Sequence, residues 1–209
     1  MDGRIVRDPE FPTVAGRHRV AVDGRELGEV AGEFLHLVLN KPRGLVTTAR
    51  DEHGRDTVYR CFDGADIGWI APVGRLDKAS EGLLLFTNDP AWAARITDPA
   101  SGPAKTYHVQ VDRIPDEVML AAMCQGVACD GDLLRAKSAT LLRAGAKNAW
   151  LGIVLDEGRN RQIRRLLAAL DIGVLRLVRV AIGSLQLGDL PKGQWRELTA
   201  EEVAALGGD

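Results

Sequence analysis

The sequence lacks the long apolar segments that membrane and secreted proteins carry. Its longest apolar runs, such as residues 83–86, fall far short of the roughly 18 residues that a membrane-spanning helix requires. The N-terminal residues 1–11 contain no apolar core of a signal peptide. We therefore expect a cytoplasmic protein that makes no contact with a membrane.

Cysteine and histidine are scarce, and neither is spaced for a metal site. The three cysteines, Cys61, Cys124 and Cys129, form no CxxC pair, and none has a histidine at ligand spacing. This pattern indicates neither a zinc site nor a disulfide framework, and it argues against a metallohydrolase. Glycine is plentiful, but no GxGxxG follows a predicted strand and no Walker A loop occurs. A nucleotide-cofactor enzyme is therefore disfavoured, and we expect neither a cofactor nor a metal.

The chain also lacks a net positive charge, since its formal charge is −2 and its pI is near 6.1. Its positive charge is instead concentrated. Between positions 159 and 179 six arginines accompany one acid, Asp171, which gives a local charge of +5. Arginine forms bidentate, charge-assisted bonds with phosphate, and a helix N-terminus adds backbone donors for the same anion. The segment predicts an anion-binding face, although a solvated helix face would have the same composition.

The composition, with 45% hydrophobic and 27% charged residues, indicates a globular chain with one substantial core and at most a small appendage. Residues 1–33 are rich in glycine and charge, with a short strand-like alternation at 19–22 that closes on the turn Asp23-Gly24. This segment is too short for a core of its own. We assign residues 34–209 to a single larger domain.

Predicted strands and helices follow one another irregularly after residue 34. The run 34–39 reads as a buried strand that ends in a turn at 40–44. Strands outnumber helices, which favours an α+β fold with a mixed, largely antiparallel sheet and flanking helices. The other predicted strands cover 69–73, 83–87, 106–111 and 149–156, and the predicted helices run from 90 to 96, from Pro115 to Gly126 and from about 160 to 170.

Two segments place chemically useful side chains beside predicted strands. Asp77 lies in the polar, glycine-bounded loop 74–82, which leads directly into an apolar strand, so a rigid scaffold would hold its carboxylate. A turn residue paired with Arg75 or Lys78 would look the same locally. Tyr107 lies within a predicted strand, where tyrosine usually fills the core, but its flat ring would also support an extruded base.

Taken together, these segments resemble the bacterial ribosomal pseudouridine synthases of the RsuA and RluE type, which modify 16S and 23S RNA. The resemblance covers residue 34 to the C-terminus, and five blocks in the family's order are far more specific than any one block. It implies the pseudouridine synthase fold, with a central catalytic cleft. The five blocks are 40–44 (NKPRG), 74–89 (GRLDKASEGLLLFTND), 105–107 (KTY), 157–165 (EGRNRQIRR) and 179–190 (RVAIGSLQLGDL).

The resemblance implies a role for each matching position. Asp77 is expected to be the catalytic aspartate, Tyr107 to stack on the target base, and Arg164 to form an ion pair that keeps Asp77 ionised. If that pair were fully buried, replacing Arg164 with alanine would cost roughly 3–5 kcal/mol. The family's RNA-binding appendage is matched only at 20–27, so residues 1–33 are expected to be its remnant. The residues expected to bind RNA phosphates are Lys41, Arg43, Arg75, Arg159, Arg161 and Arg165.

The expected activity is the conversion of uridine in ribosomal RNA, 23S rather than 16S, to pseudouridine by a monomeric enzyme. The target must be extruded from the RNA, because a stacked uracil is out of reach. The carboxylate acts either as a covalent nucleophile or as a base that drives elimination to a glycal, and the residues leave both routes open. The alternative is an RNA-binding or ribosome-assembly protein of the same fold whose catalysis is secondary or lost.

Overall fold

A computed structural model describes residues 2–7, 11, 18–22, 25–27, 34–49 and 51–207. The chain separates into two compact units, Met1–Phe34 and Leu35–Asp209. In the first unit β1 (Val20–Val22) pairs antiparallel with β2 (Arg25–Leu27), so the strand predicted around 19–22 is confirmed. The predicted turn Asp23-Gly24 lies outside the described residues.

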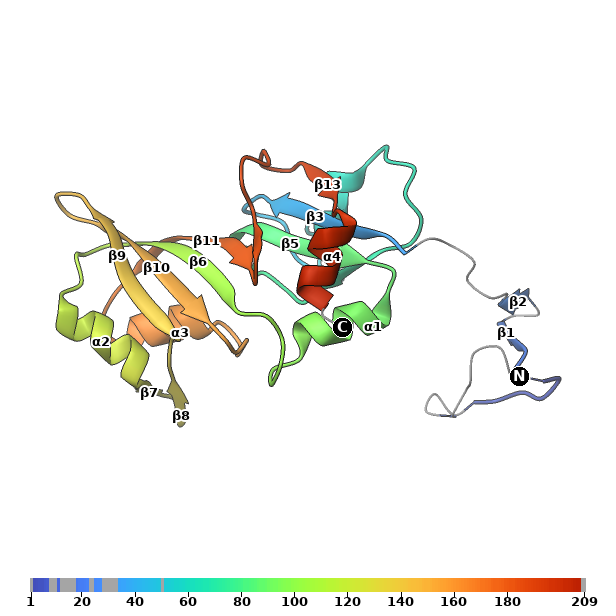
Figure 1. The fold of residues 1–209 in the computed structure, drawn as a ribbon, viewed down its shortest axis with the longest axis horizontal. Helices are drawn as coiled ribbons and strands as arrows, with labels where there is room; N and C mark the ends of the chain where they lie inside the picture. The colour runs from blue at the N-terminus through green and yellow to red at the C-terminus, as the bar shows by residue number, and fades with distance from the viewer. Residues whose placement is uncertain are drawn as a thin grey trace. The chain divides into compact units, whose positions relative to one another are not determined.

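The second unit is built on a nine-stranded mixed sheet (Figure 1). Its strands are β3 (His36–Lys41), β4 (Ala71–Val73), β5 (Glu81–Thr87), β6 (Lys105–Val111), β9 (Ser138–Ala144), β10 (Ala149–Leu155), β11 (Val174–Ile182), β12 (Leu185–Gln186) and β13 (Trp195–Glu197). The order is β13-β3-β5-β11-β6-β10-β9, with β4 also pairing with β5 and β12 with β11. Among the described strands, β5 and β11 form the one parallel pair. The predicted α+β fold with a mixed, largely antiparallel sheet is confirmed.

Helices and a small hairpin complete the unit. Beside the sheet, β7 (Val127–Cys129) and β8 (Asp132–Leu134) form a two-stranded antiparallel pair. The α-helices are α1 (Pro90–Thr97), α2 (Glu117–Gln125), α3 (Gln162–Ala169) and α4 (Ala200–Gly207), and a 3₁₀ helix spans Val58–Phe62. Within the described residues, none of these helices has the length and apolar content of a membrane span.

Capping side chains set the helix boundaries. Asp89 accepts hydrogen bonds from the backbone of Ala91 and Trp92 at 2.9 and 3.0 Å, and the predicted first helix is confirmed. The second helix begins at Glu117 rather than at Pro115, because Asp116 caps it by accepting from the backbone of Met119 at 2.8 Å. α3 is confirmed within the range 160–170. No predicted element corresponds to α4, to β7–β9 or to β11–β13.

The parallel pair at the centre of the sheet depends on one glycine. Gly82, the second residue of β5, has φ +101° and pairs with Arg179 of β11. A β-carbon at Gly82 would lie 2.2 Å from the carbonyl oxygen of Arg179, so no side chain fits there. β5 is buried along its whole length, as its continuous apolar run predicts for a central strand.

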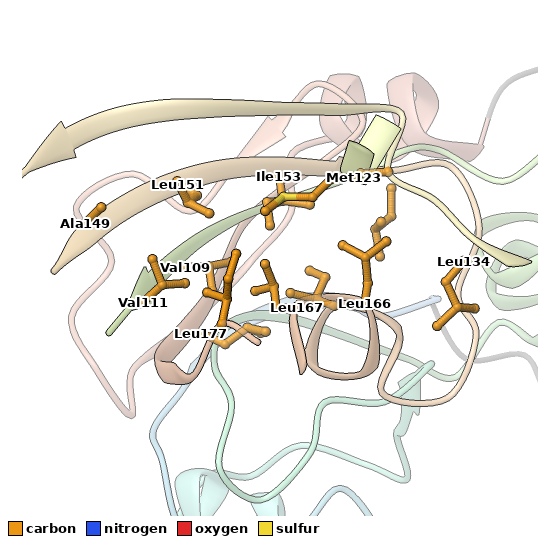
Figure 2. Packing of buried hydrophobic residues seen from close by; sticks show 14 of the residues in the cluster. Val109, Val111, Met123, Leu134, Ala149, Leu151, Ile153, Leu166, Leu167 and Leu177 are labelled. Carbon is orange, nitrogen blue, oxygen red and sulfur yellow. The ribbon is translucent and has the colours of Figure 1, made fainter. Parts of the chain in front are cut away.

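Two helical layers cover different parts of the sheet. α2 and α3 pack against β6, β10 and β11. Figure 2 shows Ile153 of β10 and Leu166 of α3 in the same cluster of apolar side chains. α1 and α4 lie side by side against another part of the sheet (Figure 1), where Trp92 donates from Nε1 to the carbonyl oxygen of Val203 at 3.2 Å. A third apolar cluster joins β3 and β5 to the 3₁₀ helix. The loop before β5 and the start of α3 meet in this framework.

Candidate active site

The loop of residues 74–80, called the Asp77 loop below, is held by backbone contacts along its length. Ser80 donates its N–H to the carbonyl oxygen of Asp77 at 2.9 Å, which closes a tight turn. The backbone N–H of Gly44 donates to the carbonyl oxygen of Lys78 at 2.8 Å. The hydroxyl of Thr47 donates to the carbonyl oxygen of Leu76 at 2.7 Å. Fixed backbone groups on both sides of Asp77 therefore set the position of its carboxylate.

Lys41 supports the Asp77 loop from the interior of the protein. Its side chain is 0% exposed, and Nζ donates to the carbonyl oxygens of Ser80 at 2.9 Å, Pro42 at 3.1 Å and Asp77 at 3.3 Å. Burial lowers the pKa of Lys41 to about 8, although Cys61, Glu81 and Asp77 oppose this shift. The prediction that Lys41 binds RNA phosphate is wrong. The strand β3 continues through Lys41 instead of turning at residue 40, so the side chain points into the protein.

Asp77 forms an ion pair with Arg161. Nη1 of Arg161 lies 3.3 Å from Oδ2 of Asp77. Arg161 is the N-cap of α3 and has φ 48° and ψ 32°, a left-handed conformation that is uncommon for a residue with a side chain. Strained backbone of this kind recurs at functional sites, where the surrounding structure holds it. Here it directs the guanidinium toward the Asp77 loop.

Arg164 lies in the same pocket but is not ion-paired with Asp77. Its Nη2 donates to the carbonyl oxygen of Ala79 at 3.4 Å, and its buried Nε has no hydrogen-bond partner among the described residues. Burial lowers the pKa of Arg164, as do the nearby charges of Arg161 and Arg43, while Asp77 acts in the opposite direction. The expected ion pair is therefore corrected: Arg161 occupies that place, because the left-handed turn before α3 brings it closer to the carboxylate.

These side chains surround a hollow of about 130 Å³ between the Asp77 loop and the start of α3. Tyr107 forms part of its wall and packs against two of the apolar clusters, so its ring has a fixed position. The lining includes Arg75, Asp77, Tyr107, Arg159, Arg161 and Arg164. The predicted catalytic residues Asp77, Tyr107 and Arg164 are thus brought to one place from three distant segments.

The remaining predicted RNA-binding arginines differ in their surroundings. Arg43 and Arg75 are exposed near the hollow. Arg159 lies at its edge and pairs with Glu157 at 3.1 Å and Asp132 at 3.4 Å. Arg165 is absent from the lining and is paired with Asp132 at 3.0 Å and Asp130 at 3.6 Å. Its guanidinium is therefore engaged by the β7–β8 hairpin.

Two supporting residues were not predicted. Gln162 is buried, and its amide donates to Glu157 at 2.6 Å and to the carbonyl oxygen of Arg135 at 2.9 Å, which fixes the turn before α3. Thr47 holds the Asp77 loop through Leu76. Nothing in the local sequence around either residue indicates these partners, because each contact joins segments more than 25 positions apart or depends on the turn geometry.

The arrangement combines a carboxylate, four guanidiniums and an aromatic wall in one small hollow. A carboxylate in this setting serves as a nucleophile or as a general base. Guanidiniums orient it and bind phosphate, and the aromatic ring offers a surface for a flat base. Within the described residues no group of three or more histidine, cysteine, aspartate or glutamate side chains is arranged to hold a metal ion.

Comparison with known proteins agrees with this geometry. Residues 35–169 match the model of the RNA pseudouridylate synthase family. The chain is 39% identical over 176 residues to a ribosomal large subunit pseudouridine synthase E of Vibrio parahaemolyticus, covering 78% of this chain and 73% of the relative. It is 40% identical over 185 residues to the protein of the same name from Xanthomonas campestris pv. campestris, covering 80% of this chain and 97% of the relative.

A solved structure described as a crystal structure of pseudouridylate synthase has the same fold. It aligns with a TM-score of 0.76 and 32% identity, over 98% of this chain and 86% of that chain. The resemblance found in the five sequence blocks is therefore confirmed by the family model, by relatives and by the fold. This chain belongs to the RNA pseudouridylate synthase family.

Proposed function

We propose that this chain converts uridine in large-subunit ribosomal RNA to pseudouridine, with Asp77 as the catalytic carboxylate. The observation that carries the proposal is the meeting of Asp77, Tyr107, Arg161 and Arg164 around one hollow. The names of the relatives in Vibrio and Xanthomonas support the large ribosomal subunit as the source of the RNA.

The reaction requires one bond to break and one to form. The bond from the ribose C1′ to N1 of uracil breaks, the ring turns, and C1′ joins C5. The proton leaves C5 and N1 gains one, so no oxidant or reductant is consumed. Asp77 acts either by attacking C1′ or by taking a proton from the ribose so that a glycal forms. Both routes use the ionised carboxylate that Arg161 contacts.

The target base reaches Asp77 only after it leaves the RNA stack. Ligand sites in proteins generally measure about 300–1,000 Å³, and the hollow of about 130 Å³ is smaller, so side chains at its mouth move when a nucleotide enters. Arg161 is suited to this because its side chain is 52% exposed. In this proposal Arg161 turns outward to a phosphate and Tyr107 supports the base. Arg164, whose buried Nε has no hydrogen-bond partner among the described residues, is uncovered by this movement and contacts the nucleotide.

Flanking phosphates are held around the hollow. Arg43 and Arg75 are exposed and lie near Asp77, whereas Arg159 and Arg165 contribute less because each pairs with two acids. Residues 1–33 are the remnant of an RNA-binding appendage, and residues 34–209 are the catalytic domain. The enzyme acts as a monomer in the cytoplasm, where ribosomal RNA is available.

The test compares the wild type with Asp77→Asn, which keeps the shape of the side chain and removes its charge. Unmodified transcripts of both ribosomal RNAs are incubated with each protein, and pseudouridine is mapped by carbodiimide-dependent primer stops. The wild type is expected to give a stop in the large-subunit RNA, and Asp77→Asn is expected to bind that RNA in a filter assay and leave none. A wild type that binds both RNAs and leaves no stop would favour the RNA-binding alternative. A stop confined to the small-subunit RNA would overturn the substrate assignment alone.

A further inference from the structure

The sheet has two faces, and one of them carries the wall of the active site. The other face, at β6, β9 and β10, is covered by none of the described helices. Leu151 and Ile153 of β10 belong to the apolar cluster under α2 and α3 (Figure 2). Successive side chains of a strand point to opposite faces, so Trp150 points away from those helices. It is half-buried and absent from that cluster. This reverse face therefore presents an aromatic side chain to solvent.

Strand register places charged side chains on both sides of Trp150. Trp150 pairs with Arg143 of β9 and with Gln110 of β6, and Gln110 pairs with Arg176 of β11. The four residues form a row across four strands. The guanidinium carbon of Arg143 lies 5.2 Å from the centre of the indole ring, and that of Arg176 lies 5.8 Å from it. Both distances are within the range of a cation–π interaction.

A β-bulge shapes the surface next to this row. The register between β10 and β9 shifts after Trp150, so Leu142 and Arg143, which are adjacent in the sequence, both line a hollow of about 510 Å³. β-bulges commonly redirect a side chain in this way. The hollow lies within the size range of ligand sites, roughly 300–1,000 Å³. It is lined by His108, Leu142, Arg143, Trp150, Arg176, Val178 and Val180, none of which is acidic.

The charge of the hollow is positive. Arg176 is held in place by the buried carboxylate of Glu81, which also pairs with Lys192, so one acid is shared by two cations at this edge. Arg143 is exposed and has no acidic partner among the described residues. Burial and the charge of Arg143 lower the pKa of His108, which favours its neutral form beside these arginines.

We propose that this reverse face, defined by Arg143, Trp150, Arg176 and His108, binds an unpaired segment of the substrate RNA. When RNA binds, the exposed Arg143 turns away from the indole to hold a phosphate, and the adjoining base takes its place against Trp150. The proposal rests on RNA as the substrate of the enzyme. It adds a contact on the side of the sheet opposite Asp77, so an RNA that binds both places wraps around the edge of the sheet.

The test measures the affinity of the full-length chain for a fluorescein-labelled, unstructured RNA of about 12 nucleotides by anisotropy. Trp150→Ala is expected to weaken binding by about tenfold or more, and Trp150→Phe, which keeps a ring, by less than about threefold. Arg143→Ala is expected to weaken binding and to reduce the slope of log Kd against log salt by about 0.7. Arg143 is exposed, so its replacement does not threaten folding.

Trp69→Ala serves as the matched control. Trp69 is 75% exposed, and among the described residues no guanidinium lies over its ring, so its loss is expected to leave the affinity unchanged. Unchanged affinity in both Trp150→Ala and Arg143→Ala would overturn the proposal, as would a wild type that does not bind this RNA. Self-association of the chain that Trp150→Ala abolishes, seen by sedimentation, would assign the face to a second copy instead. If Asp77→Asn kept activity, the proposed catalytic role would fail while the binding result stood.

Discussion

Nη1 of Arg161 lies 3.3 Å from Oδ2 of Asp77, although 84 positions separate the two residues in the chain. The side chains are 52% and 38% exposed, so solvent screens the pair and its contribution to stability is about 0–1 kcal/mol. Arg161 is nevertheless held in a left-handed conformation at the start of α3. Its contact with Asp77 therefore serves to orient the carboxylate more than to stabilise the fold.

Replacing Arg161 separates its effect on the orientation of Asp77 from its effect on stability. Glycine adopts a positive φ without strain, whereas alanine in this conformation costs about 1 kcal/mol. Urea unfolding is expected to show that Arg161→Gly is more stable than Arg161→Ala by about that amount. Both variants are expected to lose pseudouridine formation by about tenfold or more in single-turnover assays, because they lack the guanidinium that orients Asp77 before the nucleotide enters and binds a phosphate afterwards. Wild-type activity in both variants would contradict the orienting role.

Double-mutant cycles distinguish the two arginines of the pocket. In unfolding experiments without RNA, Asp77→Asn is expected to couple with Arg161→Ala by up to about 1 kcal/mol and to show no coupling with Arg164→Ala beyond the usual error of about 0.3–0.5 kcal/mol. Arg164→Ala alone is expected to cost about 1–2 kcal/mol, since it removes one carbonyl contact and no buried ion pair. A stronger coupling of Asp77 to Arg164 than to Arg161 would reverse this assignment.

The buried Lys41 predicts a particular dependence of stability on pH. Its pKa falls from the usual 10.5 to about 8 in the folded chain because of burial. Between these values the unfolded chain binds a proton that the folded chain does not, so the free energy of unfolding rises with pH across this window. Lys41→Met has no titrating group at this position. The difference in unfolding free energy, wild type minus Lys41→Met, is therefore expected to increase from pH 8 toward pH 10.5. Urea titrations at several pH values measure this difference, and a constant value would refute the lowered pKa of Lys41.

Gly82 offers a test of the central parallel pair. Gly82→Ala places a β-carbon 2.2 Å from the carbonyl oxygen of Arg179 at φ +101°, so the unfolding free energy is expected to fall by more than about 3 kcal/mol. Gly188→Ala is the control, because Gly188 also has a positive φ, 56°, but no atom of the described residues lies within 4 Å of the position that an alanine methyl group would take there. That variant is expected to lose only about 1 kcal/mol. Similar losses in both variants would show that strain, and not the close approach, dominates at Gly82.

Much of the fold was predictable because its signals are local. The cap at Asp89 and the apolar run of β5 lie within a few residues of the elements that they define. β9 and β11 were not predicted as strands. β9 exposes most of its side chains at the edge of the sheet, and in β11 Arg176 and Arg179, three positions apart, interrupt the apolar residues out of step with the period of two that marks a strand.

The burial of Lys41 shows where sequence reasoning failed at the site. A lysine beside proline and arginine is most simply interpreted as an exposed cation. Only the three carbonyl oxygens of Pro42, Asp77 and Ser80 make its burial tolerable, and two of these lie more than 30 positions away. A buried ammonium group whose hydrogen-bond acceptors are distant backbone carbonyls produces no recognisable pattern in the amino-acid sequence.

The sequence by itself determined the family, the carboxylate loop around Asp77, and the arginine cluster that opens α3, because these depend on residue types and short spacings. The tertiary structure alone decided that Arg161 and not Arg164 contacts Asp77, and that Lys41 supports the loop from inside. The physical reason is that both outcomes depend on backbone geometry at a left-handed N-cap and at the end of β3. Differences of a few ångströms between segments far apart in the chain select the partner of a charged side chain, and residue spacing does not encode such differences.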